Sequence, residues 1–557
     1  MIGFACTHVP PATNTFAMPV SLAIAARRAG RPPSLFRALA LALVLTPAAS
    51  AQVVPGEAAA IGSLSADRAR VREILGLGRG DARDSIGLTE GVSRLRAVEP
   101  VVQMVWNSNL PSEANDGALW AGRGANISVT GGGSYATWLW RRRVDVVVAP
   151  TFSYSQNRPF PTRPGRAPGR SAFSSPWYFG NTSADLPLRF GVLPVATIGP
   201  GQSSITVTTD VVAFGAASTN EWWGPSIRNT LLLSNNAAGV PRLFARTTRP
   251  RRTRFGDFEG RAFIGSLTES PYFDMDPSND HRSLSGLLII YRPPIDSGLT
   301  LGVSRLVAAP TQSAPAALLH SLDALLRYDA IRAYDDTTEV GKSNKGSDQL
   351  FSLFARWVFP QSGFEAYVEW ARAEMPHSIR EMLEVPQNTQ AYTLGLQWAN
   401  ARPSGRQLRL QGELSYLEQT RFIAARPTQD YYTGQAAVQG FTERGQVLGA
   451  SIGPGASSQF LGADWLATRW QAGAFVGRVR SENDALYREG GPRLTQHDVT
   501  VYSGVRAGLR LPKADVAGTL TIGRRYNYLL QSLFYLADNV NAVDIQNTSV
   551  AITITPR

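Results

Sequence analysis

Residues 348–372 alternate between apolar and polar side chains on either side of a Pro360-Gln361-Ser362-Gly363 turn. A strand turns successive side chains to opposite faces, so this segment predicts a hairpin with one apolar face and one largely charged face. In a soluble sandwich the apolar face would pack on a second sheet, whereas in an outer-membrane barrel it faces lipid and the charged face lines a wet interior. The apolar face carries Phe351, Leu353, Ala355, Trp357, Phe359, Phe364, Ala366, Val368 and Trp370, and the opposite face carries Asp348, Ser352, Arg356, Glu365 and Glu369.

The same alternation recurs along most of the chain, between clusters of Gly, Pro, Asn and Asp that are typical of turns. The further segments are 205–214, 284–291, 299–307, 392–398, 408–416, 447–452, 468–479, 499–510, 516–528 and 546–555. The mean hydropathy of −0.12 is that of a soluble protein, but a membrane barrel has the same appearance because half of its strand residues face water. At roughly ten residues per crossing, the chain predicts an all-β, antiparallel outer-membrane barrel of about eighteen strands.

The C-terminus leaves a second architecture open. Outer-membrane barrels commonly finish with an aromatic residue, whereas this chain ends Ile552-Thr553-Ile554-Thr555-Pro556-Arg557. A large soluble all-β protein of the periplasm is therefore the alternative fold.

The N-terminus indicates export. Four arginines precede an apolar run over 38–45, and Ala49-Ser50-Ala51 supplies the small residues of a signal peptide cleaved near Ala51. The run is less than half of the roughly 20 residues that a spanning helix needs, which disfavours a membrane anchor. The Arg27-Arg28 pair leaves twin-arginine export as an alternative route.

We expect three regions: a signal peptide over 1–51, a partly helical periplasmic segment or plug over 52–122, and the barrel over 123–557. Within the second region Ser65 is a candidate N-cap, and Val71, Ile74 and Leu75 recur at helical spacing among charged residues. A second short helix is expected around 92–95. A mostly disordered linker is the alternative for this region.

Composition disfavours several function classes. The only cysteine, Cys6, lies in the predicted leader, so the exported chain has no disulfide and no thiol nucleophile. Without the four leader arginines the chain keeps 51 basic and 43 acidic residues, and this moderate excess on an exported protein disfavours nucleic acid as a partner. The remaining histidines are scattered, without metal-ligand spacing or a nucleophile elbow. We therefore expect no enzyme activity, cofactor or metal.

Three blocks follow one another closely between Thr219 and Phe273. They read Glu221-Trp222-Trp223-Gly224-Pro225, then Leu231-Leu232-Leu233-Ser234-Asn235-Asn236-Ala237 with Pro241-Arg242, then Thr268-Glu269-Ser270-Pro271-Tyr272. Together they resemble the capsule assembly protein Wzi family, and the Phe359-Pro360 turn with the strand at 365–369 is also similar to that family. The resemblance covers 126–397, while the helical segment near Ser63 diverges from it.

The resemblance implies a barrel of about eighteen strands in the outer membrane of a Gram-negative bacterium, surrounded by lipid and lipopolysaccharide, with a helical periplasmic portion. It implies a lectin, not an enzyme, that holds capsular or exopolysaccharide at the cell surface. We also expect an acidic polysaccharide and a monomeric protein. The alternative is a porin-like channel for sugars or other small solutes, whose polar lumen looks the same in sequence. A channel predicts conductance, whereas a lectin predicts binding to long glycans.

Aromatic and amide side chains form the first candidate polysaccharide site. Rings stack on the apolar faces of sugars and amides bond their hydroxyls, much as other pockets combine apolar area with a few placed polar groups. The alternative is structural, with the tryptophans anchoring a loop inside the barrel. The candidate residues are Trp222, Trp223, Asn235 and Asn236.

A basic run over 246–254 forms the second candidate. The planar fork of arginine suits carboxylates and phosphates, so Arg249, Arg251 and Arg252 are candidates for gripping an acidic polysaccharide or lipopolysaccharide phosphate. A solvated loop or turn is the alternative for this run.

Arg356, Glu365 and Glu369 are candidates for a charge network inside the barrel, where cross-strand pairs contribute about 0.2–1 kcal/mol each. The two glutamates are four residues apart on one strand face, roughly 13 Å at about 3.3 Å per residue. Because that exceeds the separation of glycosidase carboxylates, we expect a structural role.

Overall fold

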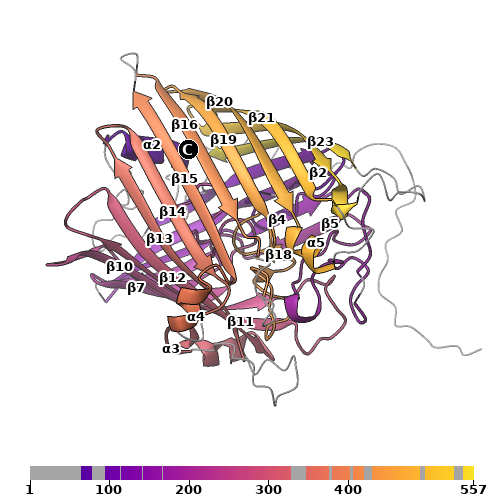
Figure 1. The fold of residues 1–557 in the computed structure, drawn as a ribbon. Coiled ribbons are helices and arrows are strands. Elements are labelled where there is room, and N and C mark those ends of the chain that lie inside the picture. The colour runs from indigo at the N-terminus through magenta and orange to yellow at the C-terminus, as the bar shows by residue number, and fades with distance from the viewer. Residues whose placement is uncertain are drawn as a thin grey trace, which may run out of the picture. The chain divides into compact units, whose positions relative to one another are not determined.

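A large antiparallel sheet dominates the computed structural model (Figure 1). The structure describes residues 64–77, 94–112, 114–140, 142–165, 167–327, 346–375, 379–401, 405–419, 429–489, 496–531 and 544–556. The strands of this sheet are β1 (Arg94–Asn107), β2 (Gly124–Leu139), β3 (Arg142–Val148), β4 (Thr151–Ser155), β5 (Val195–Gly199), β6 (Ser204–Thr208), β7 (Val212–Ala217), β8 (Arg242–Thr247), β9 (Arg251–Thr253), β10 (Gly256–Thr268), β11 (His281–Arg292), β12 (Leu299–Thr311), β13 (Asp348–Phe359), β14 (Phe364–Arg372), β15 (Gln390–Ala401), β16 (Gln407–Tyr416), β19 (Ser457–Leu466), β20 (Trp470–Ser481), β21 (Asp498–Arg510), β22 (Ala514–Tyr526) and β23 (Ile545–Pro556).

The other elements are short. A separate two-stranded hairpin is formed by β17 (Thr442–Glu443) and β18 (Gln446–Val447). The helical segments are α2 (Leu64–Ile74), η1 (Gly180–Thr182), η2 (Pro315–His320), α3 (Asp323–Leu326), α4 (Ile379–Glu384), α5 (Asn483–Glu489) and η3 (Tyr528–Leu530). Within the described part of the chain, no helix has the length and apolar character needed to cross a membrane.

The sheet closes on itself because β1 pairs with β2 on one edge and with β23 on the other. Three of its strands are interrupted: β3 and β4 lie end to end, as do β5 with β6 and β8 with β9. Each break contains a proline, Pro150, Pro200 or Pro250, which has no N–H to donate to a ladder. With each interrupted pair counted as one strand, the described chain forms a closed antiparallel barrel of eighteen strands, which confirms the predicted fold.

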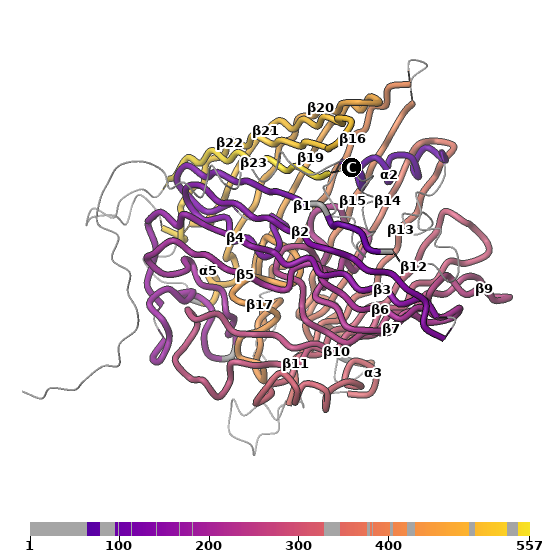
Figure 2. Tube along the Cα trace, turned by 180° about the vertical axis from the view of Figure 1, so that it is seen from behind, coloured from indigo at the N-terminus to yellow at the C-terminus, as the bar shows by residue number. Residues whose placement is uncertain are grey.

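The two ends of the barrel differ in their connections. At one end, here called the short-turn end, strands are joined by turns from two residues (254–255) to six residues (293–298). At the other, the long-loop end, connections run from twelve residues (269–280) to forty (417–456). Figure 2 shows β1 to β7 forming the wall on the opposite side of the barrel from β13 to β16.

The alternating faces of β13 and β14 lie as predicted. The two strands pair in register from Phe351 with Arg372 to Phe359 with Phe364. Trp357 is 42% exposed on the outer face, while Glu365 is fully buried on the inner face. Two apolar residues that interrupt the polar face, Phe354 and Val358, are also buried, in clusters with apolar residues of elements inside the barrel.

Several predicted boundaries are wrong. The barrel begins at β1, Arg94, and not at 123, so the expected helix around 92–95 does not form within the described part of that segment. A register shift between Val98 and Val101 interrupts the two-residue period there, which hides the strand from pattern analysis. The leader over 1–51 lies outside the described residues.

Two expected strands also differ. The segment 205–214 contains two strands, β6 and β7, because Thr209 Oγ1 accepts the N–H groups of Val211 and Val212 and so builds a turn. The segment 447–452 starts in β18, inside the loop that connects β16 to β19, and contributes nothing to the barrel wall.

The largest apolar core lies inside the barrel. It joins residues of the 218–241 loop, such as Leu231 and Leu232, to residues of the 417–456 loop, such as Tyr432 and Phe441, and to inward side chains of the wall. Both loops start and end at the long-loop end, so they fill the lumen from that side. The helix α2 lies at the other end of the barrel, as Figure 1 shows.

Candidate functional site

Two wall carboxylates hold the 218–241 loop in the lumen. Glu413 on β16 accepts the backbone N–H groups of Ile227 at 2.8 Å, Arg228 at 3.3 Å and Asn229 at 2.9 Å. Tyr367 on β14 also donates its hydroxyl to Glu413, at 2.7 Å. These bonds satisfy buried donors that no strand partner reaches, so the wall determines the path of the loop.

Glu369 on β14 supports the next turn of the same loop. Its carboxylate accepts the N–H of Leu231 at 3.1 Å and the hydroxyl of Thr230 at 3.2 Å. Gly224 has a φ of 135° and lies against the Thr230 hydroxyl and the Glu369 carboxylate. A Cβ at this position would come within 2.6 Å of the Glu369 carboxylate. The glycine of the Trp-Trp-Gly-Pro sequence is therefore required by this close approach.

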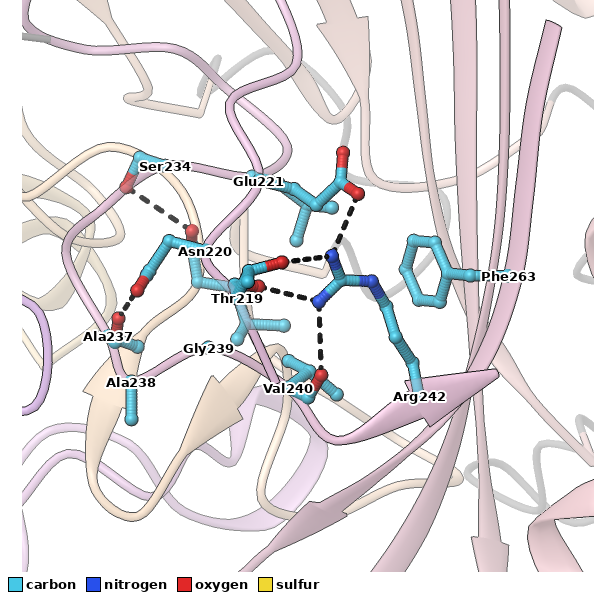
Figure 3. Close-up of a pocket in the computed structure, with 12 residues that line it drawn as sticks. Thr219, Asn220, Glu221, Ser234, Ala237, Ala238, Gly239, Val240, Arg242 and Phe263 are labelled. Carbon is cyan, nitrogen blue, oxygen red and sulfur yellow. Dashed lines mark hydrogen bonds and ion pairs between the residues drawn. The ribbon is translucent and has the colours of Figure 1, made fainter. Parts of the chain in front are cut away.

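Glu221 forms a charged centre at the start of the loop (Figure 3). Its carboxylate lies 2.8 Å from Arg242 Nη2 and 3.3 Å from Arg261 Nη1, and it accepts the indole N–H of Trp223 at 2.8 Å. Burial acts to raise the pKa of Glu221, but Arg242 and Arg261 outweigh it and hold that pKa below its usual value. Glu221 is thus ionised and fixed.

The cavity beside this centre is small. It is lined by Asn220, Leu233, Val240 and Phe263, among others, and its volume is about 20 Å³. A space of that size holds about one water molecule. The lumen core around Glu221 is consequently packed, and it offers no room for a sugar ring.

The helix α2 binds the inner wall at the short-turn end mainly through charges. Arg70 Nε donates to Glu365 Oε1 at 3.1 Å, and Arg70 Nη2 donates to the carbonyl of Pro225 at 2.6 Å. Asp67 lies 3.0 Å from Arg409 Nη2 on β16. A small apolar cluster under Val71 and Ile74 completes the contact with the wall.

Three loops meet at the long-loop end around buried carboxylates. Asp185 accepts the N–H of Ser270 at 2.7 Å, and Glu443 accepts the N–H of Thr268 at 2.8 Å. Gln439 donates to Glu269. Burial raises the pKa of Asp185 to about 6 and the pKa values of Glu269 and Glu443 to about 7. These loops are therefore joined by groups that titrate near neutral pH.

The first candidate cluster lies almost wholly in the packed core. Trp223 is 1% exposed and meets Phe263 edge-on with ring centroids 5.3 Å apart. The amide of Asn236 donates to the carbonyl of Val447, and the carbonyl of Asn235 is bonded by Gly117. Only Trp222 is half-buried, and its indole N–H donates to the carbonyl of Ser226 at 3.1 Å. This geometry matches the structural alternative for the cluster.

The second cluster lies at the short-turn end of the barrel, opposite the long loops. All three arginines are exposed: Arg249 lies in the break between β8 and β9, and Arg251 and Arg252 lie in β9, beside the turn into β10 at the short-turn end. Arg252 Nε lies 3.8 Å from Asp257 Oδ1, and its side chain is 92% exposed. The run thus occupies a solvated turn.

The inward charge network divides into two parts. Arg356 Nε lies 2.8 Å from Glu365 Oε1, and Arg356 Nη1 lies 3.0 Å from Glu73 on α2. Glu369 takes no part in that ion pair, because it bonds the 218–241 loop instead. Sequence reasoning missed the partners on α2 and on the loop, since nothing in the spacing of the wall residues indicates them.

A patch of half-buried rings and exposed polar groups lies at the long-loop end. It joins the 156–194 and 269–280 loops, whose backbones meet where Ser171 donates to the carbonyl of Phe273 at 3.0 Å. The rings of Phe173 and Tyr272 meet edge-on with centroids 5.8 Å apart. We call this the ring patch, formed by Arg170, Phe173, Tyr272, Asp276, Ser278 and Asn279.

The Arg170 guanidinium anchors the ring patch. It stacks 3.4 Å from the centroid of Phe273 and donates to Ser183 Oγ at 2.8 Å. The sequence singled out Tyr272 only as part of a block, without a role. In the described residues, no group of three or more His, Cys, Asp or Glu side chains is arranged to hold a metal ion.

Comparison with known proteins gives a family and a fold. The family model described as capsule assembly protein Wzi matches residues 197–511, more than half of the chain. A solved structure of Wzi from Escherichia coli, described as a carbohydrate-binding β-barrel of the outer membrane involved in group 1 capsule assembly, is 9% identical with a TM-score of 0.50. The match covers 82% of this chain and 84% of that one.

Another solved outer-membrane barrel is less similar in structure. The outer-membrane protein OprD from Pseudomonas aeruginosa is 9% identical, with a TM-score of 0.38 over 85% of this chain and 96% of that one. No curated protein sequence matches the chain.

The family and the closed barrel place the protein in the outer membrane of a Gram-negative bacterium. Such barrels have short periplasmic turns and longer extracellular loops. This pattern predicts that the short-turn end with α2 faces the periplasm and that the long-loop end with the ring patch faces the exterior.

Proposed function

The chain belongs to the capsule assembly protein Wzi family, and we propose that it binds capsular or exopolysaccharide at the cell surface and retains it there. The matched family is not an enzyme family, and the proposed role needs no catalytic step, cofactor or metal. The protein acts as a fixed binding surface on the outside of the membrane.

The filled lumen is the observation that carries this proposal. A porin-like channel needs a continuous wet path, whereas here the 218–241 and 417–456 loops pack a core into the lumen from outside and α2 enters from the periplasmic end. Glu413 and Glu369 bond the backbone of the 218–241 loop directly, so this loop is part of the folded barrel. A barrel filled in this way is suited to present a surface rather than to pass solutes.

The ring patch supplies the chemistry for sugars. Half-buried Phe173 and Tyr272 offer apolar ring surface beside the exposed Asp276 and Ser278, and sugar sites combine these two kinds of group. The Arg170 side chain is 13% exposed and lies 3.9 Å from Asp274, so it holds the two loops that carry these rings. Among the regions described above, this one combines rings and polar groups on the extracellular side, so we place the polysaccharide contact there and not at Trp223 or Arg252.

The test is the partition of polysaccharide between cells and medium, with total polymer quantified in both. A strain that lacks the protein should release polymer into the medium while total polymer stays unchanged. A variant with Phe173→Ala and Tyr272→Ala should release polymer to the same extent. The matched control is Trp140→Ala, which removes an exposed aromatic residue at the periplasmic end and should retain polymer as the parent does.

The outcomes separate the parts of the proposal. If deletion of the protein leaves the partition unchanged, retention of that polymer is wrong and bilayer conductance becomes the next measurement. If deletion releases polymer but the double variant does not, retention stands and the ring patch is wrong. Equal surface amounts of each variant, measured by the heat-dependent gel mobility of the folded barrel, are required for either conclusion.

A further inference from the structure

One helical segment lies outside the barrel wall. The elements η2 and α3 span 315–326 and pack on β10, β11 and β12 at the long-loop end. Figure 1 shows α3 beside the wall, below β12. Leu284 and Leu306 face the inner core. Because successive strand residues face opposite sides, their neighbours Ser285 and Arg305 face outward. The helical segment contacts these two outward residues.

The segment covers polar groups on this outer face. Ser285 Oγ accepts the N–H of Ala324 at 2.9 Å, and Arg305 donates to the carbonyl of Ala324 at 3.2 Å. Arg305 also donates to the side chain of Gln349 at 2.7 Å. An arginine facing hydrocarbon without such partners would be strongly unfavourable. The helical segment therefore supplies hydrogen-bond partners for the side chains of Ser285 and Arg305 on the outer face of the wall. We call these two side chains the polar spot.

The other side of the segment is apolar and exposed. Ala317 and Ala324 are buried against the wall, while leucines cover the opposite side. The exposed leucines are Leu318, Leu319, Leu322, Leu325 and Leu326, with exposed fractions from 52% to 86%. The charges beside them are paired: Asp323 lies 2.8 Å from His320 and 3.2 Å from Arg327. Five neighbouring leucines in water would be an unusually large apolar patch.

The leucines adjoin the lipid-facing band of the barrel. Arg305 is two residues from Val303, which pairs with Ile289 on one side and Leu353 on the other. Ile289 and Leu353 are exposed on the outer wall. Two residues of strand rise about 7 Å. The segment thus sits at the extracellular edge of the band, which is the depth at which amphipathic helices lie in a membrane interface.

We propose that the 315–327 segment is an external membrane anchor, with its five leucines inserted among the acyl chains of the outer leaflet. It lies parallel to the membrane, seals the polar spot around Arg305 from lipid, and fixes the height at which the extracellular loops stand above the bilayer. This inference is independent of the polysaccharide proposal, because it rests on the outer wall alone.

Single-cysteine labelling tests this anchor directly, since Cys6 is the only native cysteine. In a Cys6→Ser background of the full chain, Leu319→Cys and Leu325→Cys each carry a polarity-sensitive fluorophore. The matched control is Met275→Cys, an apolar residue that is 79% exposed on the 269–280 loop at the same end. Each protein is reconstituted in phosphatidylcholine vesicles with or without bromine on the acyl chains.

Bromine on the acyl chains should quench the labels at 319 and 325 at least about twofold more than the label at 275, as expected for a helix buried about 5–10 Å into the interface. Aqueous iodide should show the reverse order. If iodide quenches all three labels alike, the leucines face water and the anchor is wrong. If the leucine labels escape both quenchers and the unlabelled Leu319→Cys protein forms disulfide-linked dimers, the face binds a second copy and the anchor is equally wrong.

Discussion

The segments inside the two ends of the lumen are held by different kinds of interaction. The external filling is made of loops whose two ends both join wall strands, and it combines an apolar core with backbone N–H groups bonded to Glu413 and Glu369. The periplasmic filling is one short helix, α2, bound mostly through side-chain ion pairs such as Arg70 with Glu365 and Asp67 with Arg409. The first resembles the interior of a domain, and the second resembles a docked ligand.

This difference predicts different responses. Apolar packing and buried backbone bonds are insensitive to salt and expensive to break, whereas partly exposed ion pairs are screened and individually weak. The external filling should consequently unfold with the barrel, while α2 should undock on its own.

Glu413→Ala should have the largest effect. It removes the acceptor of three loop N–H groups and of the Tyr367 hydroxyl. Each buried donor left without a partner costs roughly 1–3 kcal/mol, so with four donors the free energy of unfolding should fall by at least about 4 kcal/mol. The loss should appear as a lower temperature for the gel-mobility shift of the folded barrel.

Glu413→Gln is the matched control, because its carbonyl oxygen still accepts part of these bonds. It should lose clearly less stability than Glu413→Ala. Equal losses in the two variants would mean that charge, and not acceptor geometry, holds the loop.

The two ends should also respond differently to pH. Burial raises the pKa of Glu269 and of Glu443 from an ordinary 4.5 to about 7. A carboxyl whose folded pKa is raised stabilises the fold fully below its ordinary pKa, and this contribution is lost as the pH rises through about 7. Hydrogen-exchange protection of 269–280 and 439–447 should therefore fall between pH 5 and pH 8, after correction for intrinsic rates.

Asp67 on α2 behaves in the other direction. Burial acts to raise its pKa, but Arg409 outweighs burial, so the pKa is lowered. Its contribution is present above its ordinary value of 3.8 and is lost only as the pH falls through the folded value. Protection of 64–74 should thus be constant between pH 5 and pH 8. Glu443→Gln should flatten the loop response, and an unchanged slope in that variant would assign the response to other groups.

Arg70→Met should weaken mainly the periplasmic filling, because the external filling loses only the hydrogen bond to the carbonyl of Pro225. Glu365 keeps its bonds to Arg356 at 2.8 Å and to Gln397 at 3.2 Å, so it is not left unpaired. The expected loss in α2 docking is about 1–2 kcal/mol. It is measured as faster hydrogen exchange in 64–74 with an unchanged barrel.

Arg72→Met is the control, since Arg72 is exposed and bonds only the nearby carbonyl of Leu77 at 3.3 Å among the contacts described. Its effect should stay within about 0.5 kcal/mol. Global destabilisation by Arg70→Met would contradict the view that α2 undocks independently.

Replacing Arg249, Arg251 and Arg252 together by Ser should have the smallest effect. These residues are exposed at the periplasmic end, so stability should change by no more than about 0.5 kcal/mol. Polysaccharide retention should also match the parent. Release of polymer from this variant would show that the periplasmic end takes part in binding.

Sequence periodicity predicted the wall better than its contents. The hairpin at 348–372, the strand pair about Pro293 and the run of strands to the C-terminus all have local alternation, and each forms in the barrel. The strand β1 escaped prediction because its irregular register near Pro100 interrupts the period. The segment 447–452 misled because a buried loop is as apolar as a strand.

The candidate sites were likewise predicted by residue type but not by position in the fold. The Trp-Trp-Gly-Pro and Ser-Asn-Asn sequences indicated the family correctly, yet their side chains are mostly buried in the lumen core. Residue type alone does not distinguish a tryptophan that stacks on a sugar from one that packs on Phe263. The ring patch, in turn, needs two loops to meet, and neither loop contains the whole pattern.

The sequence by itself predicted an outer-membrane barrel of about eighteen strands, because two-residue alternation is a local property of each strand. Only the tertiary structure decided what fills that barrel and what faces outward at its edge. Ile227 and Glu413 are 186 residues apart in the chain and 2.8 Å apart in the lumen. Contacts of that kind depend on closure of the whole sheet, so no local pattern in the sequence records them.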